Sequence, residues 1–194
     1  MHNKTASAQV NLSQLILIDM QIKLATAMPQ DAMQLATNNC SLLTQAASLL
    51  SLPIIMTEQY PQGLGATLPQ IIQFAPALKP IAKTAFSALS EPKFKQQLHR
   101  DQSQIVLAGM ESHICVLQTA LALTALTTSA DNKLAKQVFV VEDAIISRNI
   151  GNKINAIARM RDAGCIITNT ESVLFEWLSN ANHPHFKVIS QLLR

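Results

Sequence analysis

Apolar residues along the chain gather in short runs that are separated by longer stretches of mixed character. Five runs have the length and composition of buried strands: Leu15–Ile18, Pro53–Met56, Ile105–Ala108, Val138–Val141 and Cys165–Thr168. A sixth, shorter strand is expected within Leu78–Phe86. The intervening segments with helical composition are Asp31–Leu50, Ser112–Leu126 and Asn152–Asp162. Apolar strands that alternate with helices predict an α/β fold, with a parallel sheet covered on both faces.

The length of 194 residues fits a single domain that spans 1–194. No internal repeat, low-complexity tract or linker divides it. The polar residues 1–12 are expected to form a flexible N-terminus. The polar segment 127–133 is expected to be a loop between a helix and the following strand.

Charge is sparse, since only 14% of residues are charged, against about 25% in a typical soluble domain. A surface with so little charge suggests that another subunit covers part of it, so we expect a homo-oligomer. The net charge of +3 is not gathered into basic clusters, which gives no electrostatic reason to expect nucleic-acid binding. The longest apolar runs are far shorter than the ~20 residues that cross a bilayer, so no membrane association is expected.

Glycine and cysteine positions exclude several familiar sites. The five glycines fit neither G-x-G-x-x-G nor a P-loop, and the three cysteines are too far apart for a zinc pattern. No cofactor and no metal are therefore expected. An odd number of cysteines, together with a polar N-terminus that lacks a signal-peptide core, favours a cytoplasmic location.

Polar residues stand directly after several of the predicted strands. In open α/β sheets, ligands bind beyond the carboxyl ends of the strands, where such residues would converge. The four segments concerned are D-M-Q (19–21), T-E-Q-Y (57–60), G-M-E-S-H-I-C (109–115) and E-D (142–143).

Three residues stand out chemically, each with an ordinary structural alternative. Cys115 comes three residues after Ser112, a plausible N-cap, so it should lie in a first helical turn that favours a thiolate; alternatively it is a small buried hydrophobic residue. Asp19 follows an apolar strand, where a carboxylate is costly without a partner, or else it caps the next helix. Lys83 stands in an apolar segment, or else on a solvated edge. His113 and Cys115 are two positions apart, and residues at that spacing do not face each other on a helix, so no Cys–His pair is expected.

Six segments in order resemble the isochorismatase-like cysteine hydrolase superfamily, in particular its isochorismatase-domain-containing proteins. They are LILIDMQ (15–21), TEQYPQGLG (57–65), AKTAFSAL (82–89), GMESHICVLQTALAL (109–123), VVEDAIISRN (140–149) and NHPHFKVISQLL (182–193). The resemblance runs from about residue 15 to the end of the chain. It implies a three-layer α/β/α sandwich with a six-stranded parallel sheet, assembled as dimers or larger oligomers such as tetramers.

The resemblance also implies a catalytic triad of Asp19, Lys83 and Cys115. Cys115 would be the nucleophile, Asp19 the general base and acid, and Lys83 the group that orients Asp19 and stabilises negative charge. It further implies a cis peptide at Met110–Glu111 and an oxyanion hole built from the backbone N–H groups of Glu111 and Cys115. Such donors stabilise charge that develops on a carbonyl oxygen during attack.

Two departures from the motifs of the superfamily restrict the reactions that we expect. Nicotinamidases of the superfamily carry an Asp-x-His metal site after the second strand, where this chain has Thr57-Glu58-Gln59-Tyr60, so no such site is expected. Isochorismatases that hydrolyse a vinyl ether lack the cysteine nucleophile, and Cys115 argues against that reaction. The segment 127–133 is also a few residues longer than in the relatives, and we assign no function to it.

The sequence therefore predicts a cysteine hydrolase that cleaves a C–N bond in a small amide-like substrate through a thioester. Alternatives are a catalytically quiet binding or scaffold protein and a redox-responsive thiol protein, although the sequence shows no evident resolving cysteine. Candidates for the wall of the substrate pocket are Gln21, Glu58, Gln59, Tyr60, Phe86 and Ser87.

Overall fold

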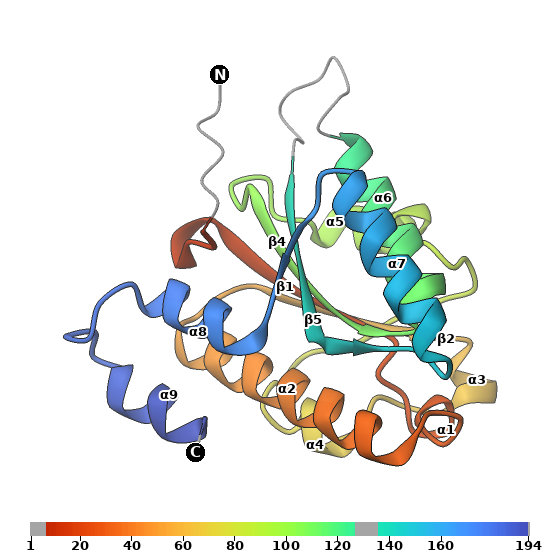
Figure 1. Ribbon diagram of the computed structural model, residues 1–194, viewed down its shortest axis with the longest axis horizontal. Helices are drawn as coiled ribbons and strands as arrows, with labels where there is room; N and C mark the ends of the chain where they lie inside the picture. Colours follow the sequence, from red (N-terminus) through yellow and green to blue (C-terminus); the bar gives the residue numbers. More distant parts are fainter. Residues whose placement is uncertain (1–6, 127–135, 194) are drawn as a thin grey trace.

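The computed structural model describes residues 7–126 and 136–193 (Figure 1). Its centre is a six-stranded, all-parallel sheet with the strand order β3-β2-β1-β4-β5-β6. This confirms the predicted sheet, including its short sixth strand. The strands are β1 (Ser13–Ile18), β2 (Ile54–Gln59), β3 (Ile81–Lys83), β4 (Gln104–Met110), β5 (Gln137–Ile146) and β6 (Ile166–Thr168).

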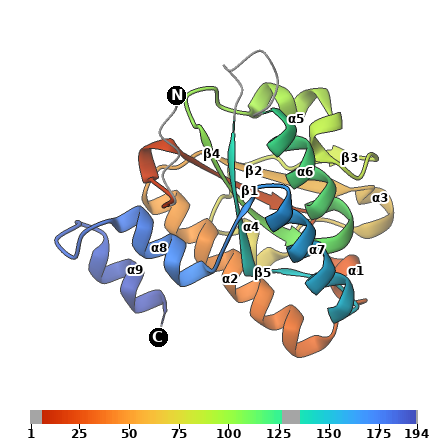
Figure 2. The same ribbon diagram turned by 45° about the horizontal axis from the view of Figure 1, so that its top comes forward.

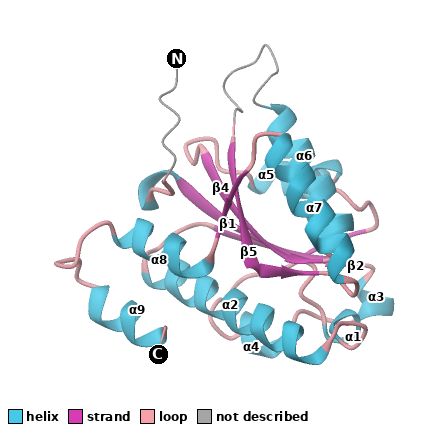
Figure 3. Cartoon of the chain, viewed as in Figure 1, coloured by secondary structure: helices cyan, strands magenta, loops and turns pink. Residues whose placement is uncertain are grey.

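Helices cover both faces of the sheet, as Figure 3 shows, and complete the three-layer sandwich. One layer contains α2 (Gln30–Leu49), α4 (Pro69–Ile72), α8 (Thr170–Leu178) and α9 (Phe186–Leu192). The other contains α5 (Pro92–Gln97), α6 (Leu117–Ala125) and α7 (Ile150–Asp162). Shorter helical segments are α1 (Ile22–Ala25), α3 (Pro61–Leu64), the 3₁₀ turns at Val10–Leu12 and Ala88–Ser90, and a π-helical turn at Ser112–Val116.

Alternate residues of β1 supply the two cores that hold these layers together. Leu15 and Leu17 pack into the core under α2 and α8, whereas Ile16 and Ile18 pack into the core under α5, α6 and α7. All four are at most 1% exposed. Both faces of the strand are thus apolar, which is why the sequence reads as a continuous run rather than as an alternating one.

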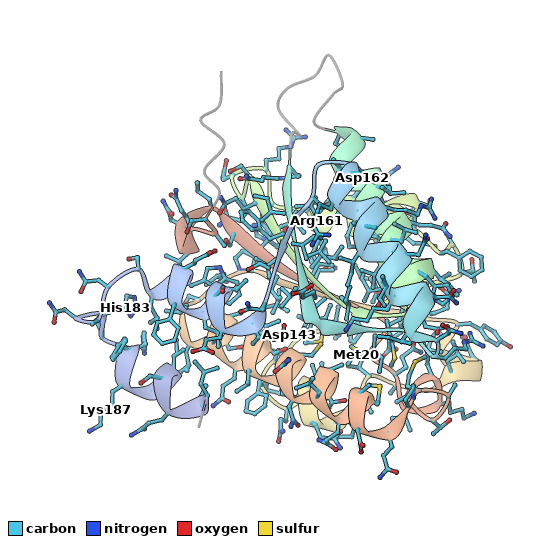
Figure 4. All side chains as sticks on the ribbon, in the orientation of Figure 1. Met20, Asp143, Arg161, Asp162, His183 and Lys187 are labelled. Carbon is cyan, nitrogen blue, oxygen red and sulfur yellow. The ribbon has the colours of Figure 1, made fainter. Side chains whose placement is uncertain are left out.

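The fourth predicted strand is longer than the sequence indicated. We expected a strand that ends at Val141 and leaves Glu142 and Asp143 at the ligand-binding edge, but β5 continues to Ile146 after a shift in register against β4. Asp143, labelled in Figure 4, accepts hydrogen bonds from the backbone N and the Oγ1 of Thr170, both at 2.9 Å. The aspartate therefore lies within the strand and anchors the start of α8, and the prediction for this pair was wrong.

Residues 7–12, the described part of the expected flexible N-terminus, pack against the rest of the protein. Ala8 is fully buried, and its backbone N donates to Glu176 Oε2 at 2.7 Å. The neighbouring Gln9 N donates to Gln104 Oε1 at 2.6 Å, which ties the segment to β4. Residues 1–6 and the segment 127–133 lie outside the described residues.

Gly109 brings β1 and β4 unusually close together near their carboxyl ends. Its φ is +123°, and a Cβ atom there would lie 2.1 Å from the carbonyl oxygen of Ile18. Only glycine fits such an approach of two backbones. The close contact lies immediately before the segments that carry Asp19 and Cys115. None of the helices in the described part of the chain has the length and apolar character needed to cross a membrane.

Candidate active site

Asp19, Lys83 and Cys115 come together from three different strands. Asp19 directly follows β1, Lys83 is the last residue of β3, and Cys115 lies in the π-helical turn after β4. Lys83 Nζ lies 2.7 Å from Asp19 Oδ2, and both side chains are fully buried. The Cys115 side chain interacts by hydrogen bonding with both of them. In Figure 4, the label of Met20, the residue next to Asp19, shows where this end of the sheet lies.

Asp19 is held tightly by its surroundings and is not a helix cap. Its φ of +51° lies in the left-handed region, which non-glycine residues seldom adopt. Its backbone N donates to Thr57 O at 3.1 Å, and Thr57 Oγ1 donates to its Oδ1 at 2.7 Å. The N-cap of α1 is Gln21, so the carboxylate is available for chemistry. The sequence reading placed Thr57 in the polar segment after the second strand but gave it no role, because its contact with Asp19 depends on atomic positions that the sequence does not show.

Lys83 is buried rather than solvated. Besides Asp19, its Nζ donates to Gln59 Oε1 at 2.6 Å and to the carbonyl oxygens of Ala85 and Phe86, both at 3.3 Å. The lysine is therefore fixed beside the carboxylate instead of moving freely in a pocket.

The surroundings of the Cys115 thiol favour its protonated form, whereas we expected a helix-stabilised thiolate. Burial first and then the charge of Asp19 raise the pKa of the thiol, Lys83 opposes them in part, and the net result is a pKa of about 12. The expected N-cap is also wrong, because the N-cap of the π-helical turn is Glu111. The buried Ser112 Oγ has no hydrogen-bond partner among the described residues. Because the pKa of the Cys115 thiol is raised, attack by its sulfur requires a base to remove the proton.

Glu111 anchors the turn that precedes Cys115. Its buried carboxylate accepts from the backbone N of Arg148 at 3.0 Å and forms an ion pair with the Arg148 guanidinium, with Nη2 to Oε1 at 2.6 Å. Burial alone would raise the pKa of this carboxyl group, but the hydrogen bonds and charge of Arg148 outweigh it and lower the pKa. The Met110–Glu111 peptide bond is cis. The sequence reading did not identify Arg148, which follows β5 and is distant in the chain.

Three of the candidates for the pocket wall are occupied by contacts within the protein. Gln21 and Gln59 exchange side-chain and backbone hydrogen bonds, and Gln59 Nε2 also donates to Thr84 O. Glu58 Oε1 accepts from the backbone N and the hydroxyl of Thr67 at 2.7 and 2.8 Å. These side chains stabilise the loop after β2 and its neighbours.

The other three candidates lie in different surroundings. Tyr60 and Phe86 are 56% and 53% exposed, so their rings are free to contact a substrate. Ser87 instead lines a largely apolar cavity of about 300 Å³. Leu98, the residue directly after α5, and Ala122 of α6 line the same cavity. Among the described residues, no three His, Cys, Asp or Glu side chains are arranged to hold a metal ion. His113 Nδ1 lies 2.9 Å from Ser147 Oγ.

Comparisons with known proteins show the family of the chain. Residues 13–172 match the model of the isochorismatase domain. The isochorismatase domain-containing protein 2 of Danio rerio is 36% identical over 182 residues, which cover 93% of this chain and 86% of the relative. A solved structure described as the MAR1 ribonuclease of Caenorhabditis elegans is 32% identical with a TM-score of 0.86, over 96% of this chain and 92% of that chain.

A more distant structural neighbour shares the fold. The YcaC gene product of Escherichia coli, described as an octameric hydrolase of unknown specificity, is 22% identical with a TM-score of 0.86, over 98% of this chain and 91% of that chain. The family model covers most of the chain, and the Danio rerio relative is similar over nearly its full length. The chain therefore belongs to the isochorismatase domain family.

Proposed function

We propose that this protein is a cysteine hydrolase that cleaves a C–N bond in a small amide-like substrate through a thioester intermediate. The observation that carries the proposal is the meeting of a nucleophilic sulfur, a carboxylate and an ammonium group in one buried cluster. Asp19 and Lys83 form an ion pair at 2.7 Å, and the thiol of Cys115 interacts with both. A nucleophile with an adjacent base that is itself oriented by a third group is typical of covalent catalysis.

In the first half-reaction, the sulfur of Cys115 attacks the carbonyl carbon of the substrate while its proton passes to Asp19. The carbonyl oxygen becomes an oxyanion, which the backbone N–H groups of Glu111 and Cys115 stabilise. Asp19 then donates its proton to the leaving nitrogen. The C–N bond breaks, an amine or ammonia departs, and the acyl group stays on sulfur as a thioester.

In the second half-reaction, water hydrolyses the thioester. Asp19, again a carboxylate, takes a proton from the water as its oxygen attacks the acyl carbon. Collapse of this second tetrahedral intermediate breaks the C–S bond and releases a carboxylic acid. The sulfur recovers a proton from Asp19, so the protonated resting state is restored. Lys83 keeps the carboxylate oriented through both steps.

The first experiment is intact-protein mass spectrometry after incubation with pooled small carboxamides, ureides and carbamoyl compounds. An adduct on Cys115 supports the proposal, and its mass names the acyl group. The Asp19→Ala variant is tested alongside, because loss of the base should change how the adduct forms and decays. Absence of any adduct and of any turnover across the panel favours the binding or scaffold alternative. Rapid formation of a sulfenic acid with peroxide, without acylation, favours the redox alternative.

The substitution Cys115→Ala is the decisive control once a substrate is found. Removal of a covalent nucleophile is expected to lower kcat by more than about 1000-fold while the protein stays folded. Cys115→Ala that still turns over an amide, in a preparation free of contaminating hydrolases, would contradict the mechanism. Because one relative is described as a ribonuclease, RNA belongs in the same panel. Cleavage of RNA that survives Cys115→Ala would likewise place the activity outside this mechanism.

A further inference from the structure

β2 lies between the two strands that carry the charged members of the proposed triad. In the order β3-β2-β1, it separates Lys83 on β3 from Asp19 after β1, yet it supplies no member of the triad itself. Figure 2 shows β3 at the edge of the sheet, outside β2. β2 is therefore placed so that its side chains can contact both charged groups.

Two residues of β2 make these contacts. Thr57 and Gln59 are two apart in the strand and thus share one face of the sheet. Thr57 Oγ1 donates to Asp19 Oδ1 at 2.7 Å, and Gln59 Oε1 accepts from Lys83 Nζ at 2.6 Å. Each charged group is held by its own residue of β2, in addition to the ion pair between them.

The two ends of the Asp19 carboxylate are therefore held in different ways. Oδ2 meets Lys83, which is fixed independently by Gln59 and two backbone carbonyls, whereas Oδ1 is held by the hydroxyl of Thr57. Without that hydroxyl, the carboxylate could pivot about its contact with the lysine. A hydroxyl that donates to a buried carboxylate also favours the charged form over the protonated form.

We propose that Thr57 is a positioning residue for the general base, and that its hydroxyl holds the Asp19 carboxylate aimed at the Cys115 proton. This inference rests on the proposed role of Asp19 in the function above. The titratable groups packed against Asp19 are Lys83 from β3 and Cys115 from the π-helical turn. Glu58, the carboxylate on β2 itself, is bonded to Thr67 instead.

The test compares Thr57→Val, which has the same shape without the hydroxyl, with Thr57→Ser, which keeps the hydroxyl without the methyl group. The readout is the pH titration of the Asp19 Cγ signal in protein labelled with ¹³C-aspartate, assigned by its loss in Asp19→Asn. This measurement needs no substrate. Thr57→Val should move the titration midpoint upward by about one pH unit, whereas Thr57→Ser should stay close to wild type.

A matched control is Thr44→Val, which removes an equally buried hydroxyl that donates to Cys40 O within α2. It should leave the Asp19 titration unchanged, and Thr57→Ala replaces the valine variant if that one fails to fold. The proposal is overturned if Thr57→Val titrates like wild type, or if Thr57→Ser shifts as far as Thr57→Val. The second outcome would assign the effect to packing of the methyl group.

Turnover provides a separate arm once a substrate is known. Thr57→Val should lower kcat about tenfold with little change in KM, and should move the acid limb of the kcat/KM profile to higher pH. Unchanged kinetics would overturn the positioning role and leave the hydrolase proposal intact. Conversely, turnover that survives Cys115→Ala would remove the proposed function, whatever the Asp19 titration shows.

Discussion

At the scale of single residues, the surroundings of the Cys115 thiol favour its protonated form. Burial and the charge of Asp19 together raise the pKa of the Cys115 thiol to about 12, so almost none of it is ionised at neutral pH. The proposed reaction therefore requires the adjacent base. This differs from the thiolate site expected from a helix N-terminus, where the sulfur would be charged before a substrate arrives.

The substitution Asp19→Asn should separate thiol reactivity from catalysis. Loss of the aspartate charge removes an influence that raises the pKa of Cys115 and leaves Lys83, which lowers it, without a counter-charge. Alkylation of Cys115 by iodoacetamide at pH 8 should therefore be about tenfold faster than in wild type. Turnover should fall by about 100-fold or more, because the base is gone.

Alkylation is followed by mass spectrometry, and Cys115→Ala identifies the contribution of the other two cysteines. Both of those are buried, and burial raises the pKa of each thiol. A slower reaction of Cys115 in Asp19→Asn would mean that the carboxylate activates the resting thiol. That result would contradict the prediction that the charge of Asp19 limits the reactivity of the resting thiol.

At the scale of elements, the ion pair between Glu111 and Arg148 joins the turn before Cys115 to the end of β5. Its partners lie 37 residues apart in sequence, and the carboxylate is only 3% exposed. Arg148→Ala would leave this carboxylate buried with fewer donors. The free energy of unfolding at pH 7 should fall by about 2 kcal/mol, measured by urea denaturation.

The same variant has a defined pH dependence. Because Arg148 lowers the pKa of Glu111 in the folded protein, the stabilisation is present above the ordinary range of a glutamate and is lost as pH falls through the lowered pKa. The difference between Arg148→Ala and wild type should thus shrink in acid. Arg161→Ala, in the exposed last turn of α7, is the control and should cost less than about 1 kcal/mol at every pH. A constant difference across pH would show that Arg148 acts through packing alone.

The elements show where sequence reasoning succeeds and where it fails. The strands could be predicted because residues such as Leu15–Ile18 are apolar on both faces, which only a doubly covered sheet requires. The end of β5 could not, because Asp143 is a charged residue inside a strand, with its partner Thr170 on a distant helix. The π-helical turn at Cys115 and the contact of Thr57 with Asp19 depend on atomic positions that periodicity does not encode.

At the scale of the whole molecule, the surface of α7 carries an apolar patch. Ile150 and Ile154 are 68% and 62% exposed and lie one turn apart, so they share one side of the helix. Charged residues make up only 14% of the chain. We expect the protein to form a homo-oligomer in which this face of α7 is covered by another copy.

The double substitution Ile150→Asp/Ile154→Asp should dissociate that assembly, which light scattering coupled to size-exclusion chromatography would detect. Leu35→Asp, at an exposed leucine of α2, is the matched control and should leave the mass unchanged. Circular dichroism checks that each variant is folded. A wild-type protein that elutes as a monomer would refute the expectation directly, and an unchanged mass of the double variant would place the contact elsewhere.

The buried triad has a consequence for how a substrate is captured. The negative Asp19, the positive Lys83 and the neutral Cys115 thiol sum to zero, so the resting centre is electroneutral. Such a centre projects little field into the solvent and offers no long-range attraction to ions. Recognition must then come from shape and from short-range hydrogen bonds. The rate of substrate capture should accordingly vary little with ionic strength, which agrees with the proposed hydrolysis of an uncharged amide.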